Sequence, residues 1–274
     1  MKKRFKKVIE ENWIDNKSWK EDSVKNVVFE IIEKLDQGTL RVSEPLNPET
    51  WKVNEWIKKS ILMFFWIQKM EVFKSVNLEF NDKIPLKGRY REKNIRVVPP
   101  AIARYGSYIS SGVVLMPSYV NIGAYIGAST MIDTWATIGS CAQIGERVHI
   151  SGGVGIGGVL EPIHKSPVII EDDVFVGSRC IVVEGVHIKK EAVLGANVVL
   201  TSSTKIFDVT KSQSKLMKGI IPSRSVVIPG SYPKELPAAG IYHIPCALIL
   251  GKRKESTDKK TSLNEALREY KVSL

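Results

Sequence analysis

The sequence has few cysteines and no long hydrophobic run. Its three cysteines, Cys141, Cys180 and Cys246, are too few and too scattered for a disulfide framework or a CxxC metal site. The longest purely apolar run, Ile61–Ile67, is much shorter than a membrane span. The basic start, Met1–Lys7, leads into polar sequence and not into a hydrophobic signal core. These absences predict a cytoplasmic protein that has no membrane segment.

Lysine is absent from the middle of the chain. No lysine lies between Lys93 and Lys165, although the formal net charge is +11. Basic ends that flank a middle of low charge do not resemble a surface that reads nucleic acid. The excess charge therefore predicts solvated, lysine-rich ends and no nucleic-acid partner. A few of the basic residues are expected to bind phosphate groups.

Composition divides the chain into three parts. Residues 1–94 hold five of the six tryptophans and predict an α-helical N-terminal domain. Residues 95–206 are rich in glycine and β-branched residues, and residues 207–274 form a C-terminal segment of strands that ends in a short helix over Ser262–Tyr270. The helical spacing in the first part is carried by Trp56, Ile57, Ser60, Ile61, Phe64 and Phe65.

The middle part repeats every six residues. An apolar residue recurs at each step, and a second series follows the first after a slip, which predicts an insertion between residues 157 and 169. The first series is Ile102, Tyr108, Val114, Val120, Ile126, Ile132, Ile138, Ile144, Ile150 and Ile156, and the second is Ile170, Val176, Val182, Ile188, Leu194 and Leu200.

A six-residue period fits neither an α-helix, with its period of 3.6, nor an alternating strand, with its period of 2. It is typical of a parallel β-helix, in which each hexad supplies a short strand and a turn, and each apolar residue stacks on its counterpart in the next coil. With three hexads in a turn, these sixteen positions predict about five coils.

The hexapeptide pattern resembles the acyltransferases built on a left-handed parallel β-helix. Four stretches further resemble the tetrahydrodipicolinate N-succinyltransferase family: Arg96–Pro100, Met116–Ala124, Met131–Thr137 and Ser151–Pro162. The resemblance implies a mainly β fold with a helical N-terminal domain. It also implies a homotrimer with active sites in the grooves between subunits. The implied reaction moves a succinyl group from succinyl-CoA to the amine of ring-opened tetrahydrodipicolinate, in lysine and diaminopimelate biosynthesis, with no permanently bound cofactor.

The substrate amine is itself the nucleophile in such a reaction, so the site must hold it, accept its proton and stabilise an oxyanion. Asp133 matches the family's active-site carboxylate, and it follows the inward Ile132, so we expect it to project outward at a corner of the prism. The alternative is that Asp133 only forms a turn at that corner.

Two arginines match positions with which the family binds substrate. Arg96 is expected to bind a carboxylate of the acceptor, because a guanidinium offers two parallel donors; the alternative is a surface arginine before a Pro-Pro linker. Arg179 is a candidate clamp for a second carboxylate. One position departs from the family: Ile181 stands where a second carboxylate is usual, which puts a mechanism with two carboxylates in doubt.

We expect the co-substrate to contact glycines and a lysine. Gly158 and Gly177 are candidates for close approach of the pantetheine arm or for simple corner turning. Lys205 is a candidate phosphate contact, and so are Arg224, Lys252 and Arg253, although each also suits a solvated surface.

The histidines are the residues that a rival function would need. His149 and His187 occupy equivalent places in the repeat, so they either stack near each other or face solvent, and no third ligand for zinc is evident. We therefore expect no metal. The alternatives that the sequence leaves open are an acetyl-CoA-dependent acyltransferase of the same fold, a β-helical zinc lyase and a non-catalytic scaffold.

Overall fold

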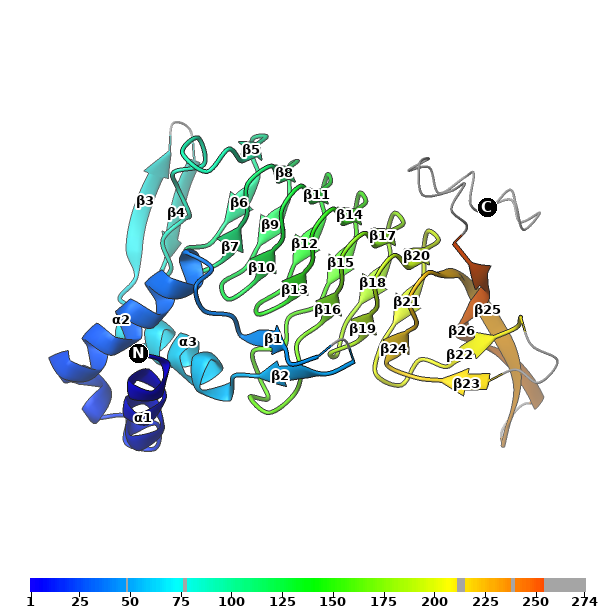
Figure 1. The fold of residues 1–274 in the computed structure, drawn as a ribbon, viewed down its shortest axis with the longest axis horizontal. Coiled ribbons are helices and arrows are strands. Elements are labelled where there is room, and N and C mark those ends of the chain that lie inside the picture. Colours follow the sequence, from blue (N-terminus) through cyan, green and yellow to red (C-terminus); the bar gives the residue numbers. More distant parts are fainter. Residues whose placement is uncertain (48, 76–77, 211–214, 238–239, 254–274) are drawn as a thin grey trace.

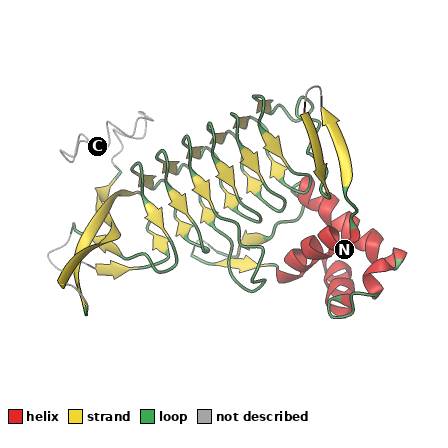
Figure 2. Ribbon diagram, turned by 180° about the vertical axis from the view of Figure 1, so that it is seen from behind, coloured by secondary structure: helices red, strands yellow, loops and turns green. Residues whose placement is uncertain are grey.

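The computed structural model describes residues 1–274 except 48, 76–77, 211–214, 238–239 and 254–274. The chain forms an elongated β-helix with helices packed at one end and a long hairpin at the other (Figures 1 and 2). No helix in the described part of the chain is long and apolar enough to cross a membrane.

The N-terminal part contains three α-helices, as predicted, together with a 3-10 turn and two hairpins. The buried residues of α3 include Trp56, Ile57, Ser60, Ile61 and Phe64, which confirms the predicted apolar face. The hairpins were not predicted, because their strands have three or five residues each. The elements are α1 (Lys2–Asn12), η1 (Ser18–Lys20), α2 (Asp22–Asp36), β1 (Ser43–Pro45), β2 (Trp51–Val53), α3 (Glu55–Ile67), β3 (Glu71–Ser75) and β4 (Leu78–Asp82).

Two-residue strands then wind into a left-handed parallel β-helix with three sheets, as expected. Sheet 1 contains β5 (Arg96–Val97), β8 (Val114–Leu115), β11 (Met131–Ile132), β14 (His149–Ile150), β17 (Phe175–Val176), β20 (Val193–Leu194) and the start of β25. Sheet 2 contains β6 (Ile102–Ala103), β9 (Tyr119–Val120), β12 (Thr137–Ile138), β15 (Gly155–Ile156), β18 (Ile181–Val182) and β21 (Val199–Leu200). Sheet 3 contains β7 (Tyr108–Ile109), β10 (Tyr125–Ile126), β13 (Gln143–Ile144), β16 (Ile169–Ile170), β19 (His187–Ile188) and β24 (Ile220–Ile221).

The second residue of each two-residue strand points into the prism, and all of these residues are buried except Val97 of β5, which is partly buried against the same core. The hexad series is therefore correct from Val120 onward and wrong by one residue before it. The inward residues of the first coil and the start of the second are Ala103, Ile109 and Leu115, not Ile102, Tyr108 and Val114. The step from Leu115 to Val120 is one residue short of a hexad, and both residues of β7 and β8 are apolar, so periodicity alone could not reveal the change.

Each sheet of the prism contains six stacked coil strands or more, so the estimate of about five coils was one too low. The predicted insertion is confirmed: it separates β15, which ends at Ile156, from β16, which begins at Ile169. The insertion is held from the N-terminal part, because the buried Nζ of Lys58 donates a hydrogen bond to the carbonyl oxygen of Lys165 at 2.6 Å.

The N-terminal helices pack on the edge between sheets 2 and 3. Ile122 and Cys141 of this edge lie in the same buried cluster as the apolar faces of the helices. A second link is the ion pair between the buried Lys87 and Asp36, in which Nζ lies 2.6 Å from Oδ1. The helical part is thereby fixed to the first coils of the prism.

The C-terminal segment closes the far end of the prism. It consists of β22 (Ile206–Asp208), β23 (Lys215–Met217), β24 and the antiparallel hairpin β25 (Ser225–Leu236) and β26 (Gly240–Lys252). The strands predicted for this segment are present. The predicted helix over residues 262–270 lies outside the described residues.

Candidate active site

Asp133 lies on the edge that joins sheet 1 to sheet 2, directly after β11. It follows the buried Ile132 and is half-buried at the corner of the prism, as the repeat predicted. Its Oδ1 accepts hydrogen bonds from the backbone N–H of Thr134 at 2.7 Å and from the Thr134 hydroxyl at 3.2 Å. Its Oδ2 accepts none within the described residues. Oδ1 therefore fixes the orientation of the carboxylate, and Oδ2 is available to bind a ligand.

The next coil leaves space in front of this carboxylate. Gly152 lies beneath it, and even a Cβ added at Gly152 would remain 4.0 Å from Oδ2 of Asp133. His149, on the outer face of β14 in that coil, stacks on Phe175 with ring centroids 5.0 Å apart. Burial lowers the pKa of His149, while the nearby charge of Asp133 opposes this shift. A neutral imidazole thus stands close to the carboxylate.

Arg179 lies on the same edge, two coils farther along the prism. Its backbone N–H donates to the carbonyl oxygen of Gly152 at 3.0 Å. Its side chain leans back over Gly153, because its Cγ is 3.4 Å from the position that a Gly153 Cβ would occupy. Neighbouring coils are about 4.8 Å apart, so the Arg179 side chain extends toward the coil that carries Asp133.

Arg96 opens β5, in the first coil of sheet 1, and is exposed. Through β8 it is in register with Met131, two residues before Asp133. A cavity of about 580 Å³ surrounds it, and the lining includes Arg91 and the partly buried Tyr90. The structure thus places Arg96, Asp133 and Arg179 along one side of the prism, in its first, third and fifth coils.

The predicted co-substrate residues do not form one cluster within the chain. Gly177 lies on the edge between sheets 1 and 2, and Gly158 lies on the edge between sheets 2 and 3. A Cβ would lie 2.7 Å from the Ala196 nitrogen at Gly177 and 2.4 Å from the Ser140 nitrogen at Gly158. Close packing between coils therefore accounts for both glycines without a ligand.

Lys205 follows β21 toward the edge between sheets 2 and 3, and its Nζ lies 4.2 Å from the ring centroid of Tyr232. The other phosphate candidates serve internal contacts: Arg224 pairs with Glu191, Lys252 donates to the Ser223 carbonyl, and Arg253 donates to the Asp173 carbonyl. Among these four residues, Lys205 is thus the one whose ammonium group has no acceptor oxygen within the described part of the chain.

Ile181 lies on the outer face of sheet 2, in register with Gly155 and Val199, and its side chain is 37% exposed. The position where the family usually has a second carboxylate therefore faces outward beside Arg179. An apolar group stands there in this chain.

The histidines do not meet, because β14 with His149 belongs to sheet 1 and β19 with His187 belongs to sheet 3. The expectation that they could stack was wrong, since strands equivalent in the hexad can belong to different sheets. The Nε2 of His187 is instead 2.6 Å from Oε1 of Glu171. Within the described ranges, no group of three or more His, Cys, Asp or Glu side chains could hold a metal ion.

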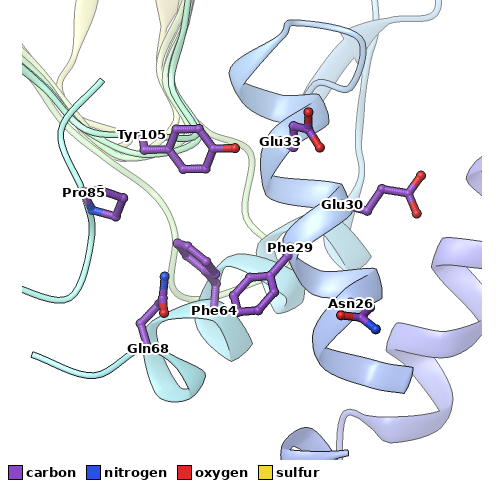
Figure 3. Close-up of a pocket in the computed structure, with 8 residues that line it drawn as sticks. All are labelled: Asn26, Phe29, Glu30, Glu33, Phe64, Gln68, Pro85 and Tyr105. Carbon is purple, nitrogen blue, oxygen red and sulfur yellow. The ribbon is translucent and has the colours of Figure 1, made fainter. Parts of the chain in front are cut away.

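A separate cavity of about 380 Å³ lies between α2 and α3 at the helical end (Figure 3). Phe29, Phe64 and Tyr105 supply its rings, and Glu30 and Glu33 supply carboxylates. A site with these charges repels dicarboxylates and phosphates. This cavity is therefore a poor candidate for the site of acyl transfer.

The sequence analysis missed two features of the candidate site. It did not identify Arg91, and it did not place His149 close to Asp133. Arg91 is separated from Arg96 by a turn, so spacing gave no signal. The position of His149 could have been found by aligning Met131 with His149 one coil later, because the two are register partners.

Comparison with known proteins identifies two family models in the chain. Residues 4–67 match a model described as tetrahydrodipicolinate N-succinyltransferase N-terminal. Residues 167–202 match a model described as the hexapeptide repeat of succinyl-transferase.

Relatives extend the similarity over nearly the whole chain. A 2,3,4,5-tetrahydropyridine-2,6-dicarboxylate N-succinyltransferase of Polynucleobacter asymbioticus is 45% identical over 96% of this chain and 98% of its own. Proteins of the same name are 47% identical in Acinetobacter baylyi, over 89% of this chain and 90% of that one, and 44% identical in Variovorax paradoxus, over 98% and 100%.

Among solved structures, the fold resembles that of a Campylobacter jejuni protein named as a candidate 2,3,4,5-tetrahydropyridine-2-carboxylate N-succinyltransferase. The TM-score is 0.50 at 15% identity, over 82% of this chain and 62% of that one. This likeness supports the fold alone, whereas the sequence relatives define the family. The chain belongs to the tetrahydrodipicolinate N-succinyltransferase family.

Proposed function

We propose that this protein transfers the succinyl group of succinyl-CoA to the amine of ring-opened tetrahydrodipicolinate, a step of lysine and diaminopimelate biosynthesis. The observation that carries the proposal is the position of Asp133, which matches the family's carboxylate. Its Oδ1 is fixed by Thr134, and its Oδ2 accepts no hydrogen bond among the described residues. The relatives named for this reaction, at 44–47% identity, support the same choice of substrates.

In the proposed reaction the acceptor amine attacks the thioester carbonyl of succinyl-CoA. A carbon–nitrogen bond forms and the carbon–sulfur bond breaks, so that CoA leaves as a thiolate, which becomes the free thiol when it takes up the proton that Asp133 has received from the nitrogen. Asp133 orients the amine through Oδ2 and takes up the proton that the nitrogen loses. Since the amine is the nucleophile, the buried cysteines of the chain are not needed for catalysis.

Arg96 and Arg179 would bind the carboxylates of the acceptor from the two sides of Asp133. Guanidinium groups suit this role because they donate two parallel hydrogen bonds to a carboxylate. The arginine pair in the Arg96 cavity, Arg91 and Arg96, strengthens the attraction for a dianion.

We further propose a homotrimer whose sites combine two edges of the prism. Asp133 and Arg179 lie on one edge of sheet 2, and Lys205 lies toward its other edge, so one chain alone cannot gather them. The exposed apolar side chains of Ile181 and Val199 on sheet 2 and of Trp135 beside Asp133 suit burial against a second copy. Light scattering should give three times the 30.6 kDa chain mass; a monomer would overturn this part of the proposal.

The deciding experiment measures thiol release from acyl-CoA by the purified protein, with and without the amine acceptor. We expect release from succinyl-CoA only when acceptor is present, and a much smaller rate with acetyl-CoA. A preference for acetyl-CoA would assign the chain to the acetyl-transferring alternative. No acceptor-dependent release with either thioester would favour the non-catalytic alternative.

A further inference from the structure

The β1–β2 hairpin lies beside the prism (Figure 1). Residues of both line a cavity of about 370 Å³ at the edge between sheets 3 and 1. It is separate from the edge that carries Asp133. The hairpin side supplies Arg41, Pro45, Asn47 and Trp51, and the prism side supplies Tyr125, Gly127, Gly145, Glu146, Ile170, Glu171, Asp172 and Lys190. The cavity thus combines rings, one rigidly held cation and carboxylates.

Arg41 is held in a fixed position in this cavity. Its Nε donates to Oε1 of Gln143 at 3.0 Å, and Gln143 is fully buried, with its own amide group donating to the Cys141 carbonyl at 2.9 Å. The guanidinium carbon lies 3.7 Å from the ring centroid of Tyr125 and 5.4 Å from that of Trp51. Stacking and the Nε bond together fix the plane of the guanidinium.

The charge of Arg41 has no partner of opposite sign in contact. Among the described residues, no carboxylate lies within 4.0 Å of its nitrogens, and neither terminal amino group donates a hydrogen bond. Burial lowers the pKa of Arg41, yet arginine keeps its proton in proteins. A desolvated cation without a counter-ion is costly, and an anionic group of a ligand would relieve that cost.

Three carboxylates also line the cavity, and two of them are already engaged. Glu171 faces His187 with Oε1 and accepts the Lys190 N–H with Oε2, and Glu146 pairs with Arg147. Asp172 accepts the Glu146 N–H at 2.8 Å with Oδ1. Its Oδ2 accepts no hydrogen bond in the described part of the chain, so Asp172 can still bind a cationic group.

We propose that this cavity binds a free L-α-amino acid, whose carboxylate pairs with Arg41 and whose ammonium group pairs with Oδ2 of Asp172. The side chain of the ligand would pack on Trp51. A plain dianion would meet three carboxylates, and a plain cation would meet Arg41, so a zwitterion satisfies both ends of the cavity. The volume lies within the range of small-molecule sites.

Calorimetry on the intact protein tests the proposal with the twenty protein L-amino acids, one at a time. We expect at least one to bind, and its decarboxylated amine and its deaminated acid to bind at least about ten-fold more weakly, since each lacks one charged contact. Absence of binding by all twenty would overturn the proposal. Equal binding of the deaminated acid would overturn it too, because that result describes a simple anion site.

Two variants assign the contacts. Asp172→Asn keeps an oxygen for the Glu146 N–H and loses the charge, and we expect affinity to fall at least about ten-fold. Arg41→Gln should abolish binding; if it does not fold, Arg41→Lys, which keeps charge without the forked donors, should weaken binding in a protein with native circular dichroism. The matched control is Lys52→Gln, an exposed position on the same hairpin, with unchanged affinity expected. Unchanged affinity in Asp172→Asn would contradict the assigned orientation.

Discussion

Arg179 lies across Gly153: its Cγ is 3.4 Å from where a Cβ of Gly153 would be, and Gly153 has a φ of +69°. A residue other than glycine is strained at this φ, and a methyl group at Gly153 would come into van der Waals contact with the arginine. The position of a substrate-binding candidate is thus set by the coil beneath it.

Gly153→Ala should therefore lower the free energy of unfolding by about 1–2 kcal/mol and raise the KM for the acceptor, with a smaller effect on kcat. Urea unfolding and steady-state kinetics measure the two effects. Gly88→Ala is the control, since a Cβ there would meet nothing within 4 Å. An unchanged acceptor KM in Gly153→Ala would argue against a role for Arg179 in binding.

Lys58→Met should release the insertion between β15 and β16. The substitution removes the hydrogen bond from Nζ to the Lys165 carbonyl. It also removes a buried cation, whose pKa is lowered by burial. Since burying that charge is unfavourable, its removal offsets part of the lost free energy of unfolding. We expect trypsin to cleave after Lys165 several-fold faster than in the parent protein. Lys59→Met, which instead removes a contact with Glu10, should leave that cleavage rate unchanged; equal rates in both variants would contradict the role given to Lys58.

His149 should make stability depend on pH. Burial lowers its pKa below 6.5 in the folded protein, so the unfolded chain takes up the proton first as the pH falls. At pH 7.5 the ring is neutral in both the folded and the unfolded protein. The free energy of unfolding therefore decreases as the pH falls through about 6.5. His149→Gln removes this contribution.

Thermal unfolding at pH 7.5 and pH 5.5 measures the effect. The drop in melting temperature between the two pH values should be smaller in His149→Gln than in the parent, whereas His243→Gln, at an exposed position, should show the parent's drop. A drop of the same size in all three proteins would contradict the inferred burial of His149.

The sequence predicted the prism well because the same pattern of apolar residues recurs every six residues along the chain. Such a period is satisfied only when every coil has the same number of residues. The one-residue error before Val120 arose where Tyr108–Ile109 and Val114–Leu115 each place two apolar residues side by side, so hydrophobicity could not tell inside from outside. The position of Asp133 followed from the same rule, because it comes directly after an inward isoleucine.

Contacts between distant parts of the chain could not be predicted in this way. Arg41 and Gln143 are 102 residues apart, and neither belongs to a motif. His149 and Asp133 interact because two coils stack, and this needs the exact number of residues in each coil. The two hairpins of the N-terminal part have strands too short to show an alternating pattern.

Ile181→Glu should increase turnover if a second carboxylate assists the reaction, as the family pattern implies. The side chain is 37% exposed in one chain and faces the proposed second copy, so light scattering must first show that the variant keeps the oligomeric state of the parent. We expect kcat to rise about ten-fold, because a second acid–base group adjoins the first. Ile181→Gln, which has the length of glutamate without the acid–base group, should leave kcat within about two-fold of the parent; an unchanged kcat in Ile181→Glu would mean that Asp133 suffices.

The central claim is that the Asp133 carboxylate accepts the proton of the attacking amine. Asp133→Asn keeps an oxygen for the Thr134 N–H, so the fold should be retained, and Asp15→Asn is the matched control, because Asp15 accepts the Lys17 N–H in a similar turn at 3.0 Å. The decisive measurement is acceptor-dependent thiol release from succinyl-CoA by these two variants and the parent. We predict a kcat about 10²–10⁴-fold lower in Asp133→Asn and unchanged in Asp15→Asn; parental turnover in a folded Asp133→Asn protein would contradict the account.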